Sequence, residues 1–280
     1  MTLLQSKIRP ILLITLLLFL AGCASQLGPS KAIIRIKGSD TLLPLAKRWA
    51  ATYMQQNPNI SVYVDGGGTA TGAQALAVGA AEICTASRPL RPEEVKNIVE
   101  NHGTLGYSFL VAKEAIAIFL NQENPVETFT LEEIKQIFTG EMDNWNKFAW
   151  QDTAIYLYGR SPNSGTRYYL REHVLHGESY SVDMQVLAGT SAIVRAVQDN
   201  PFAIGYGGLA YGKGVKLARV ENIEITAENI RNDSYPITRY LYLYTVNKPR
   251  GQVKKFIDWT MTDAGQKIVQ EAGYLPVIKF

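Results

Sequence analysis

The chain has 280 residues, with 28 lysines and arginines against 25 aspartates and glutamates, so its formal net charge is +3 at pH 7. The basic residues form no block, and we therefore expect no nucleic-acid partner. The length allows one large hydrophobic core or two smaller ones.

The first residues have the pattern of an export signal. Lys7 and Arg9 supply positive charge, residues 11–20 are apolar apart from Thr15, and a Leu-Ala-Gly-Cys sequence ends at Cys23. The apolar run is shorter than the about 20 residues that a membrane-spanning helix needs, and it suits a signal peptide. The sequence that ends at Cys23 resembles a bacterial lipoprotein cleavage box, which implies cleavage before Cys23 and lipid attachment to its sulfur.

This resemblance predicts a lipoprotein signal peptide at residues 1–22, a tether at residues 23–31, and a lipid anchor in the bacterial cell envelope, in the periplasm or on the outer surface. The alternative is an ordinary secretory signal with a chance cysteine. Cleavage would reduce the basic residues from 28 to 26 and leave a charge of about +1. With Cys23 acylated, Cys84 has no disulfide partner; we interpret it as a small buried hydrophobe, with a reactive thiol as the alternative.

The first third of the mature chain alternates strand-like and helix-like patterns. Expected strands lie at residues 33–36, 60–65 and 82–86, and expected helices at residues 43–56, 73–78 and 92–101. Asp40 or Thr41 is the expected cap of the first helix. This order predicts an α/β domain with a largely parallel sheet.

After an apolar strand at residues 114–121 the character of the chain changes. We expect further strands at residues 155–159, 202–206 and 240–246, helices at residues 130–139, 166–175, 191–199, 252–260 and 262–272, and a Trp-rich loop at residues 140–151. Thr130 is the expected N-cap of the helix at residues 130–139. The economical arrangement is two α/β lobes, with the second inserted into the first. Lobe 1 would comprise residues 32–117 plus 241–280, and lobe 2 residues 118–240.

Three short polar segments stand where helices are expected to begin. They are Gly-Ser-Asp-Thr at residues 38–41, Gly-Gly-Gly-Thr-Ala-Thr-Gly at residues 66–72, and Arg-Ser-Pro-Asn-Ser-Gly-Thr at residues 160–166. A helix start offers unpaired N–H groups and a partial positive charge, which favour an anion, and hydroxyl side chains add donors. Together with Arg160, the segments predict a closed pocket for a small tetrahedral oxyanion.

Each of these segments also has a purely structural interpretation. Residues 66–72 could be a plain strand-to-helix turn, residues 164–166 a helix cap, and Arg160 a surface ion-pair residue. Residues 66–72 match neither the dinucleotide-binding fingerprint nor the P-loop. We expect no metal and no cofactor, because the three histidines lack a ligand pattern with acidic or cysteine partners; they are His102, His173 and His176.

Six segments form a more specific series along the mature chain. They are GSDTLLPLA at residues 38–46, GGGTATG at 66–72, ASRPL at 86–90, RSPNSGTR at 160–167, NPFAIGY at 200–206 and YPITR at 235–239. In this order and spacing the series resembles the phosphate-binding proteins of bacterial ABC importers, within the type II periplasmic binding protein superfamily. The resemblance covers nearly the whole mature chain. It implies a two-lobed α/β fold, each lobe a mixed, largely parallel sheet flanked by helices, with crossing strands near residues 114–121 and 235–244.

The resemblance also implies a ligand set for phosphate. It consists of hydroxyls, backbone amides and one charged side chain, contributed by Thr41, Leu42, Thr69, Ser87, Arg160, Ser164, Gly165 and Thr166. Some relatives carry an aspartate directly after the serine that corresponds to Ser87, where it accepts the proton of hydrogen phosphate and excludes sulfate. Here that position is Arg88, either a second cationic ligand or a salt-bridge residue outside the pocket. Asp40 is a candidate proton acceptor, with a solvent-facing helix cap as the alternative.

The function implied is that of a non-enzymatic solute-binding lipoprotein. It would capture inorganic phosphate, as hydrogen phosphate, and deliver it as a monomer to an ABC transporter permease. The alternative is an oxyanion sensor or surface lipoprotein that is not coupled to transport. An enzyme acting on phosphate esters would need a nucleophile with a base or a metal. The sequence has no Gly-x-Ser-x-Gly elbow and no histidine near a candidate serine.

Overall fold

Strands and helices alternate from the beginning of the described chain, which in this computed structural model comprises residues 31–278. The expected signal peptide and the lipidation site Cys23 lie outside the described residues. The strands β1 (Ala32–Gly38), β2 (Ile60–Asp65) and β3 (Ile83–Ala86) are connected by α2 (Leu43–Gln56) and α3 (Thr69–Ala77). The helix α4 (Pro92–His102) follows β3, and β1 pairs with β3 in parallel. The α/β character predicted for this part of the chain is confirmed.

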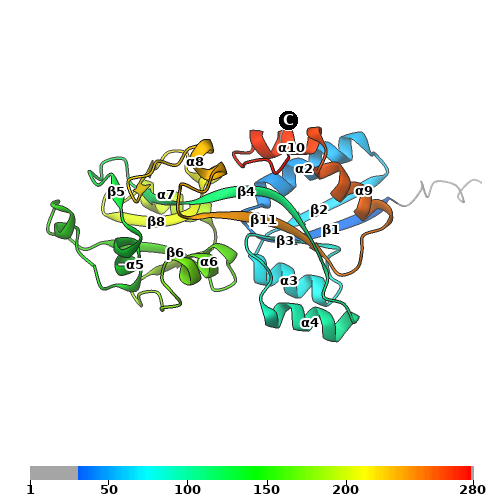
Figure 1. Ribbon diagram of the computed structural model, residues 1–280, viewed down its shortest axis with the longest axis horizontal. Coiled ribbons are helices and arrows are strands. Elements are labelled where there is room, and N and C mark those ends of the chain that lie inside the picture. Colours follow the sequence, from blue (N-terminus) through cyan, green and yellow to red (C-terminus); the bar gives the residue numbers. More distant parts are fainter. Residues whose placement is uncertain (1–30, 279–280) are drawn as a thin grey trace, which may run out of the picture. The chain divides into compact units, whose positions relative to one another are not determined.

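Two long strands join the two ends of one mixed sheet. They are β4 (Tyr107–Leu120) and β11 (Thr238–Thr245), which pair antiparallel from Thr238↔Ala115 to Thr245↔Tyr107. The strand β11 also pairs with β3, whereas the last five residues of β4 pair with β8 (Ala203–Gly208). Figure 1 shows both strands passing between the group of helices around β1 and the group around β8.

The sheet has nine strands in the order β2-β1-β3-β11-β4-β8-β6-β7, with β9 paired to β4. We refer to β2, β1 and β3 as its first half, and to β8, β6 (Tyr156–Arg160) and β7 (Gln185–Leu187) as its second half. Within the second half β6 pairs in parallel with both neighbours. The remaining elements are β5 (Thr128–Phe129), α5 (Leu131–Thr139), η1 (Trp145–Phe148), α6 (Gly165–His173), α7 (Thr190–Gln198), η2 (Leu209–Tyr211), β9 (Lys216–Leu217), β10 (Arg219–Val220), α8 (Ala227–Arg231), α9 (Gly251–Thr260) and α10 (Asp263–Glu271).

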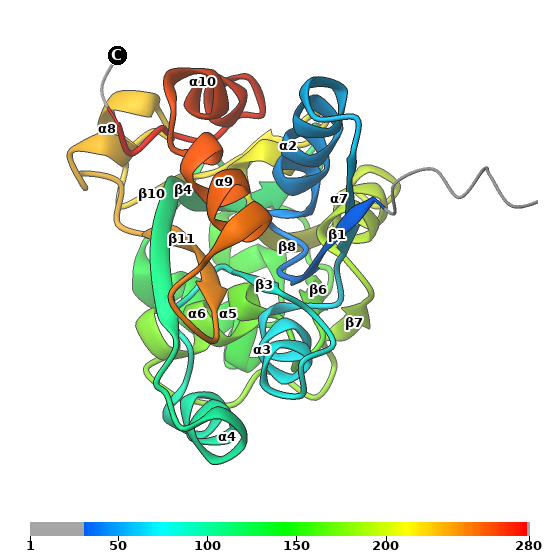
Figure 2. The same cartoon turned by 90° about the vertical axis from the view of Figure 1, so that its right-hand side faces the viewer.

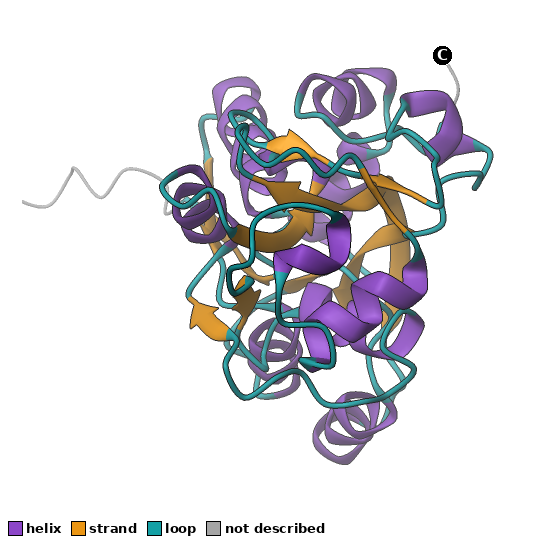
Figure 3. Ribbon diagram, turned by 90° about the vertical axis from the view of Figure 1, so that its left-hand side faces the viewer, coloured by secondary structure: helices purple, strands orange, loops and turns teal. Residues whose placement is uncertain are grey.

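Helices cover both faces of the sheet. Around the first half, α3 and α4 lie on one face and α2, α9 and α10 on the other (Figures 1 and 2). Around the second half, helices likewise flank the strands (Figure 3). The apolar stripe of α2 accounts for its position, because Leu45, Trp49 and Tyr53 are buried at helical spacing against Phe256 of α9.

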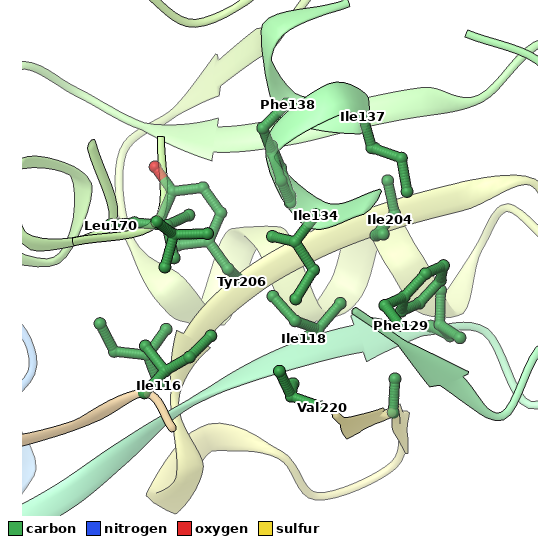
Figure 4. Packing of buried hydrophobic residues seen from close by; sticks show 14 of the residues in the cluster. Ile116, Ile118, Phe129, Ile134, Ile137, Phe138, Leu170, Ile204, Tyr206 and Val220 are labelled. Atoms are coloured by element: carbon green, nitrogen blue, oxygen red, sulfur yellow. The ribbon is translucent and has the colours of Figure 1, made fainter. Parts of the chain in front are cut away.

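The sheet has a separate large hydrophobic core in each half. The first core gathers residues of β1, α2, α9 and α10, including Ile34, Trp49 and Phe256. The second gathers residues of α5, β4 and β8; Figure 4 shows Ile134 and Phe138 of α5 facing Ile118 and Ile204. Burying each of these side chains contributes roughly 1.5–3 kcal/mol.

Several local expectations need correction. The strand β4 begins at Tyr107, seven residues before the expected start, and its residues from Tyr107 onward pair with β11. The helix α3 begins at Thr69 rather than at residue 73, so the glycine-rich turn leads into the helix sooner. Neither Asp40 nor Thr41 caps α2, whose N-cap is Leu42 without a side-chain bond. The short elements β5, β7, β9, β10 and α8 were not expected from the sequence.

Two other local predictions are confirmed. Thr130 caps α5 and its hydroxyl accepts a hydrogen bond from the Glu133 amide at 3.1 Å. Cys84 is a free cysteine and fully buried, and burial raises the pKa of its thiol well above the ordinary range. Because the thiolate is the reactive form, Cys84 acts as a small hydrophobe.

Candidate anion-binding site

The predicted binding segments all follow the carboxyl ends of strands. Residues 39–42 follow β1, residues 66–68 follow β2 and Ser87 follows β3, all in the first half of the sheet. Residues 161–164 follow β6 in the second half. In open α/β sheets this edge is where ligands bind, because the loops and helix N-termini gather there.

The first segment is a sharp turn that only glycine can enter. Gly38 has φ +148°, and a Cβ at this position would lie 2.1 Å from the carbonyl oxygen of Thr85. Beyond the turn, the carbonyl of Thr41 accepts a hydrogen bond from the hydroxyl of Tyr274 at 2.6 Å, and the carbonyl of Asp40 accepts one from Tyr211 at 2.6 Å. The loop is therefore held from both sides with the hydroxyl of Thr41 buried. The amide of Leu42 donates to the carbonyl of Ser39 at 3.2 Å.

The glycine-rich second segment lies against the third segment. Gly68 is the N-cap of α3 at φ +95°, and a Cβ there would lie 2.4 Å from the carbonyl oxygen of Asn163. The amide of Ala70 donates to that same carbonyl at 3.3 Å. Glycine at residue 68 thus allows a backbone from the second half of the sheet to approach the start of α3 closely.

The hydroxyls of Thr69 and Ser87 meet at the start of α6. Their oxygens are 3.4 Å apart, and both side chains are fully buried. A Cβ on Gly165 would lie 2.4 Å from Thr69 Oγ1 and 2.5 Å from Ser87 Oγ. Ser164 is the N-cap of α6, and its hydroxyl accepts from the amide of Arg167 at 3.3 Å, which leaves its own proton to donate elsewhere.

A second pair of hydroxyls meets across the two halves of the sheet. Thr41 Oγ1 and Thr166 Oγ1 are 3.1 Å apart, and each residue is only 1% exposed. The structure therefore brings together all three polar segments predicted from the sequence. Four buried hydroxyls, from Thr41, Thr69, Ser87 and Thr166, lie where the first and second halves meet.

Arg160 is buried at this junction and not on the surface. It is 1% exposed; Nη1 donates to Thr190 Oγ1 at 3.0 Å, and Nη2 forms an ion pair with the carboxylate of Asp40. The other carboxylate oxygen of Asp40 accepts from the amide of Gly67 at 2.8 Å. Among the described residues Arg160 Nε is buried without a hydrogen-bond partner, so one donor of the guanidinium is unused.

Arg88 is engaged in an ion pair with the start of α4. Its Nη1 and Nη2 donate to the carboxylate of Glu94 at 2.7 and 2.6 Å, and its guanidinium lies 4.9 Å from the ring centre of Tyr168. Burial alone would raise the pKa of Glu94, but hydrogen bonds from Arg88 and the amide of Arg91 outweigh it and lower that pKa. Of the two roles considered for Arg88, these contacts support the salt bridge.

A second buried arginine at the junction was not among the residues predicted to bind the ligand. Arg239 on β11 is the register partner of Glu114 on β4, and its Nε donates to Glu114 Oε1 at 2.8 Å. Its Nη2 donates to Thr166 Oγ1 at 2.9 Å and to Thr41 Oγ1 at 3.2 Å. Burial raises the pKa of Glu114, and the charge of Arg239 opposes that shift. The only signal in the sequence was the position of Arg239 at the end of the YPITR segment.

The arrangement of the two halves of the sheet and of the donors between them defines the class of protein. Two α/β halves joined by two long strands, with buried donors at their junction, form the fold of the two-lobed type II periplasmic binding proteins. A model of the PBP superfamily domain matches residues 24–264, and the chain belongs to this superfamily.

Within the superfamily the chain is similar to phosphate-binding proteins named PstS. It is 28% identical to PstS of Pseudomonas aeruginosa, over 86% of this chain and 81% of the relative, and 29% identical to PstS of Bacillus subtilis, over 90% and 84%. A crystal structure from Clostridium perfringens, assigned as a phosphate ABC transporter substrate-binding protein and containing bound phosphate, superimposes with a TM-score of 0.81 at 30% identity. The match covers 88% of this chain and 100% of that one. An ABC-type phosphate transport receptor from Vibrio cholerae gives a TM-score of 0.72 at 27% identity, over 86% and 99%. The chain is thus a PstS-like member of the superfamily.

Two further observations concern only the part of the chain that the structure describes. None of its helices is long and apolar enough to cross a membrane. Within residues 31–278 no three histidine, cysteine or acidic side chains are grouped so that they could hold a metal ion.

Proposed function

We propose that this protein binds inorganic phosphate between its two lobes and delivers it to the permease of an ABC transporter. The observation that carries the proposal is the convergence of four buried hydroxyls and the guanidinium of Arg160 on one junction. A dehydrated anion requires many directed hydrogen bonds in place of its water shell. The relatives named as phosphate-binding proteins support phosphate as the anion, and the similar transporter substrate-binding protein and transport receptor support transport as the purpose.

The proposed ligands are the hydroxyls of Thr41, Thr69, Ser87, Ser164 and Thr166, the backbone amides of Leu42 and Gly165, and the side chain of Arg160. For the Leu42 amide, binding requires release of the Ser39 carbonyl to which it now donates. Hydrogen bonds to charged groups contribute about 1.5–3 kcal/mol each, so eight would exceed known affinities if simply added. Closure of the lobes and ordering of the loops offset much of this sum.

The ion pair between Asp40 and Arg160 bears on selectivity. Hydrogen phosphate has a proton to donate, whereas sulfate has none, so a carboxylate facing the ligand would discriminate against sulfate. Asp40 is the proposed acceptor, since it directly precedes Thr41 and its carboxylate pairs with Arg160 through Oδ2 and accepts from the amide of Gly67 through Oδ1. Replacement of Asp40 by asparagine should therefore narrow the preference for phosphate over sulfate.

Isothermal titration of the purified soluble protein tests the binding proposal. Phosphate should give a one-site isotherm, and Arg160→Ala should weaken binding by at least tenfold. The matched control is Arg219→Ala, which removes an arginine that is 46% exposed and paired with Glu127. A flat phosphate titration, with heat instead from sulfate or molybdate, would keep the fold and overturn the ligand. Parent-like binding by Arg160→Ala would overturn the site.

We also propose a lipid anchor at Cys23, a position in the cell envelope and a monomeric state. The relatives act as binding proteins, so no chemical turnover of phosphate is proposed. Incorporation of labelled fatty acid into the full-length chain should be lost in Cys23→Ala and retained in Cys84→Ala. Labelling of Cys23→Ala would refute the anchor. The sedimentation coefficient of the soluble protein checks the monomeric state.

A further inference from the structure

The ion pair between Glu114 and Arg239 contacts two of the proposed ligands, the hydroxyls of Thr41 and Thr166. Both side chains are almost fully buried, at 2% and 4% exposure, on the two long strands that join the halves of the sheet. Nη2 of Arg239 reaches the hydroxyl oxygens of Thr41 in the first half and Thr166 in the second. One guanidinium therefore contacts a hydroxyl from each side of the junction.

The polarity of these hydrogen bonds is determined by the chemistry of arginine. A guanidinium has donors and no acceptor and stays charged, whereas a hydroxyl has one proton and two lone pairs. When Arg239 donates to both threonine oxygens, neither hydroxyl can use its proton on Arg239. Thr41 and Thr166 are 3.1 Å apart, so one proton can bond the neighbouring oxygen and the other remains available. The cluster consequently presents a donor, which suits an oxyanion.

Glu114 stabilises the buried guanidinium of Arg239. An unpaired buried arginine would be strongly destabilising, and the carboxylate of Glu114 compensates it through Nε and Nη2. The Asp40–Arg160 pair also joins a buried arginine to a carboxylate, through Nη2 alone, so the junction holds two arginines and two carboxylates. Among the described residues Nη1 of Arg239 has no partner. Because the two arginines are balanced by two carboxylates, the junction offers an anion oriented hydrogen-bond donors rather than a large excess of positive charge.

We propose that Arg239, held by Glu114, is a positioning residue for anion binding: it orients the hydroxyls of Thr41 and Thr166 across the two lobes. The inference rests on the phosphate-binding function proposed above and deepens it. It identifies a pair that the resemblance to phosphate-binding proteins did not assign a role.

The test compares phosphate affinity in the variant Glu114→Gln/Arg239→Gln with that of the parent protein. The double substitution removes both charges together and leaves no unpaired ion. We expect the dissociation constant to rise at least tenfold, while the far-ultraviolet circular dichroism remains that of the parent. The matched control is Glu127→Gln/Arg219→Gln, an exposed arginine–glutamate pair whose removal should leave the affinity unchanged. Should the buried variant fail to fold, Arg239→Lys, which retains the charge but not the planar fork, provides the same comparison.

A coupling measurement separates positioning from a merely structural role or from direct contact. The same double substitution is made in a Thr166→Val background, where one of the hydroxyls that Arg239 orients is absent. If Arg239 acts through the hydroxyls, its loss should cost at least threefold less in this background than in the parent. An equal cost in both backgrounds would overturn the positioning role, as would parent-like affinity of the double variant. Failure of the parent itself to bind phosphate would instead refute the proposed function.

Discussion

A single methyl group added at Gly165 should block the site. Gly165 is the first residue of α6 in the second half of the sheet, and Thr69 and Ser87 belong to the first half. The alanine Cβ would lie 2.4 Å from Thr69 Oγ1 and 2.5 Å from Ser87 Oγ, well inside the 3.0 Å that real Cβ contacts respect. The two oxygens must therefore move away by at least 0.6 and 0.5 Å, the differences from 3.0 Å.

The size of the effect follows from the bonds that these oxygens are proposed to make. A hydrogen bond to a charged group contributes about 1.5–3 kcal/mol, so losing two costs about 3–6 kcal/mol. At about 1.4 kcal/mol per factor of ten, the dissociation constant for phosphate should rise roughly 10²- to 10⁴-fold. Stability without phosphate should hardly change, because alanine suits a first helical turn and opening of the lobes relieves the clash.

Isothermal titration and thermal unfolding of Gly165→Ala measure the two expectations separately. The matched control is Gly189→Ala, at another helix start, where an added Cβ meets no atom within 4 Å. The control should bind phosphate like the parent. If Gly165→Ala bound within threefold of the parent, the two hydroxyls would not be ligands in the closed form, and the proposed site would be wrong.

Three further substitutions test the energetics of the fold around the site. Glu94→Gln leaves Arg88 unpaired and should lower the unfolding free energy by about 3 kcal/mol at pH 7. Because the pKa of Glu94 is lowered in the folded protein, the stability that its carboxylate contributes is complete above the ordinary pKa of 4.5 and declines as the pH falls. Urea unfolding should therefore show a smaller difference in unfolding free energy between the parent and Glu94→Gln at pH 3.5 than at pH 7. An equal difference at both pH values would contradict this reasoning. Ile134→Ala, in the second core, should cost about 2–5 kcal/mol in urea unfolding and leave the phosphate affinity of the folded protein unchanged. Tyr274→Phe removes the hydrogen bond to the carbonyl of Thr41 and should cost about 1 kcal/mol with a few-fold loss of affinity by titration; parent-like values in both would show that this bond does not support the loop.

The sequence predicted those features that depend on a few neighbouring residues, namely strands, helices, caps and polar helix starts. The alternating strands and helices of the first third were predicted because apolar spacing and turn residues are local properties. The three polar segments were predicted to converge because each combines a strand end, small residues and hydroxyls before a helix. Thr130 as the cap of α5 was likewise predictable, since a capping box spans only four residues.

Contacts between distant strands were decided only by the tertiary structure. Glu114 and Arg239 are 125 residues apart, and nothing local in either segment indicates that the register of β4 and β11 places them opposite each other. The same holds for the ion pair between Asp40 and Arg160, which are 120 residues apart in the chain. The start of β4 at Tyr107 is also set by the partner strand, because its pairing with β11 extends to Tyr107↔Thr245.

The sequence by itself therefore determined which residues could donate hydrogen bonds to an anion. The tertiary structure decided which buried ion pair contacts those donors, namely Glu114 with Arg239. The physical reason is the range of the interactions. Caps, turns and hydroxyl-rich helix starts depend on neighbours within a few residues, whereas a buried ion pair is stable only where two long-range strands exclude water around both partners. That exclusion is a property of the packed sheet and not of any one segment.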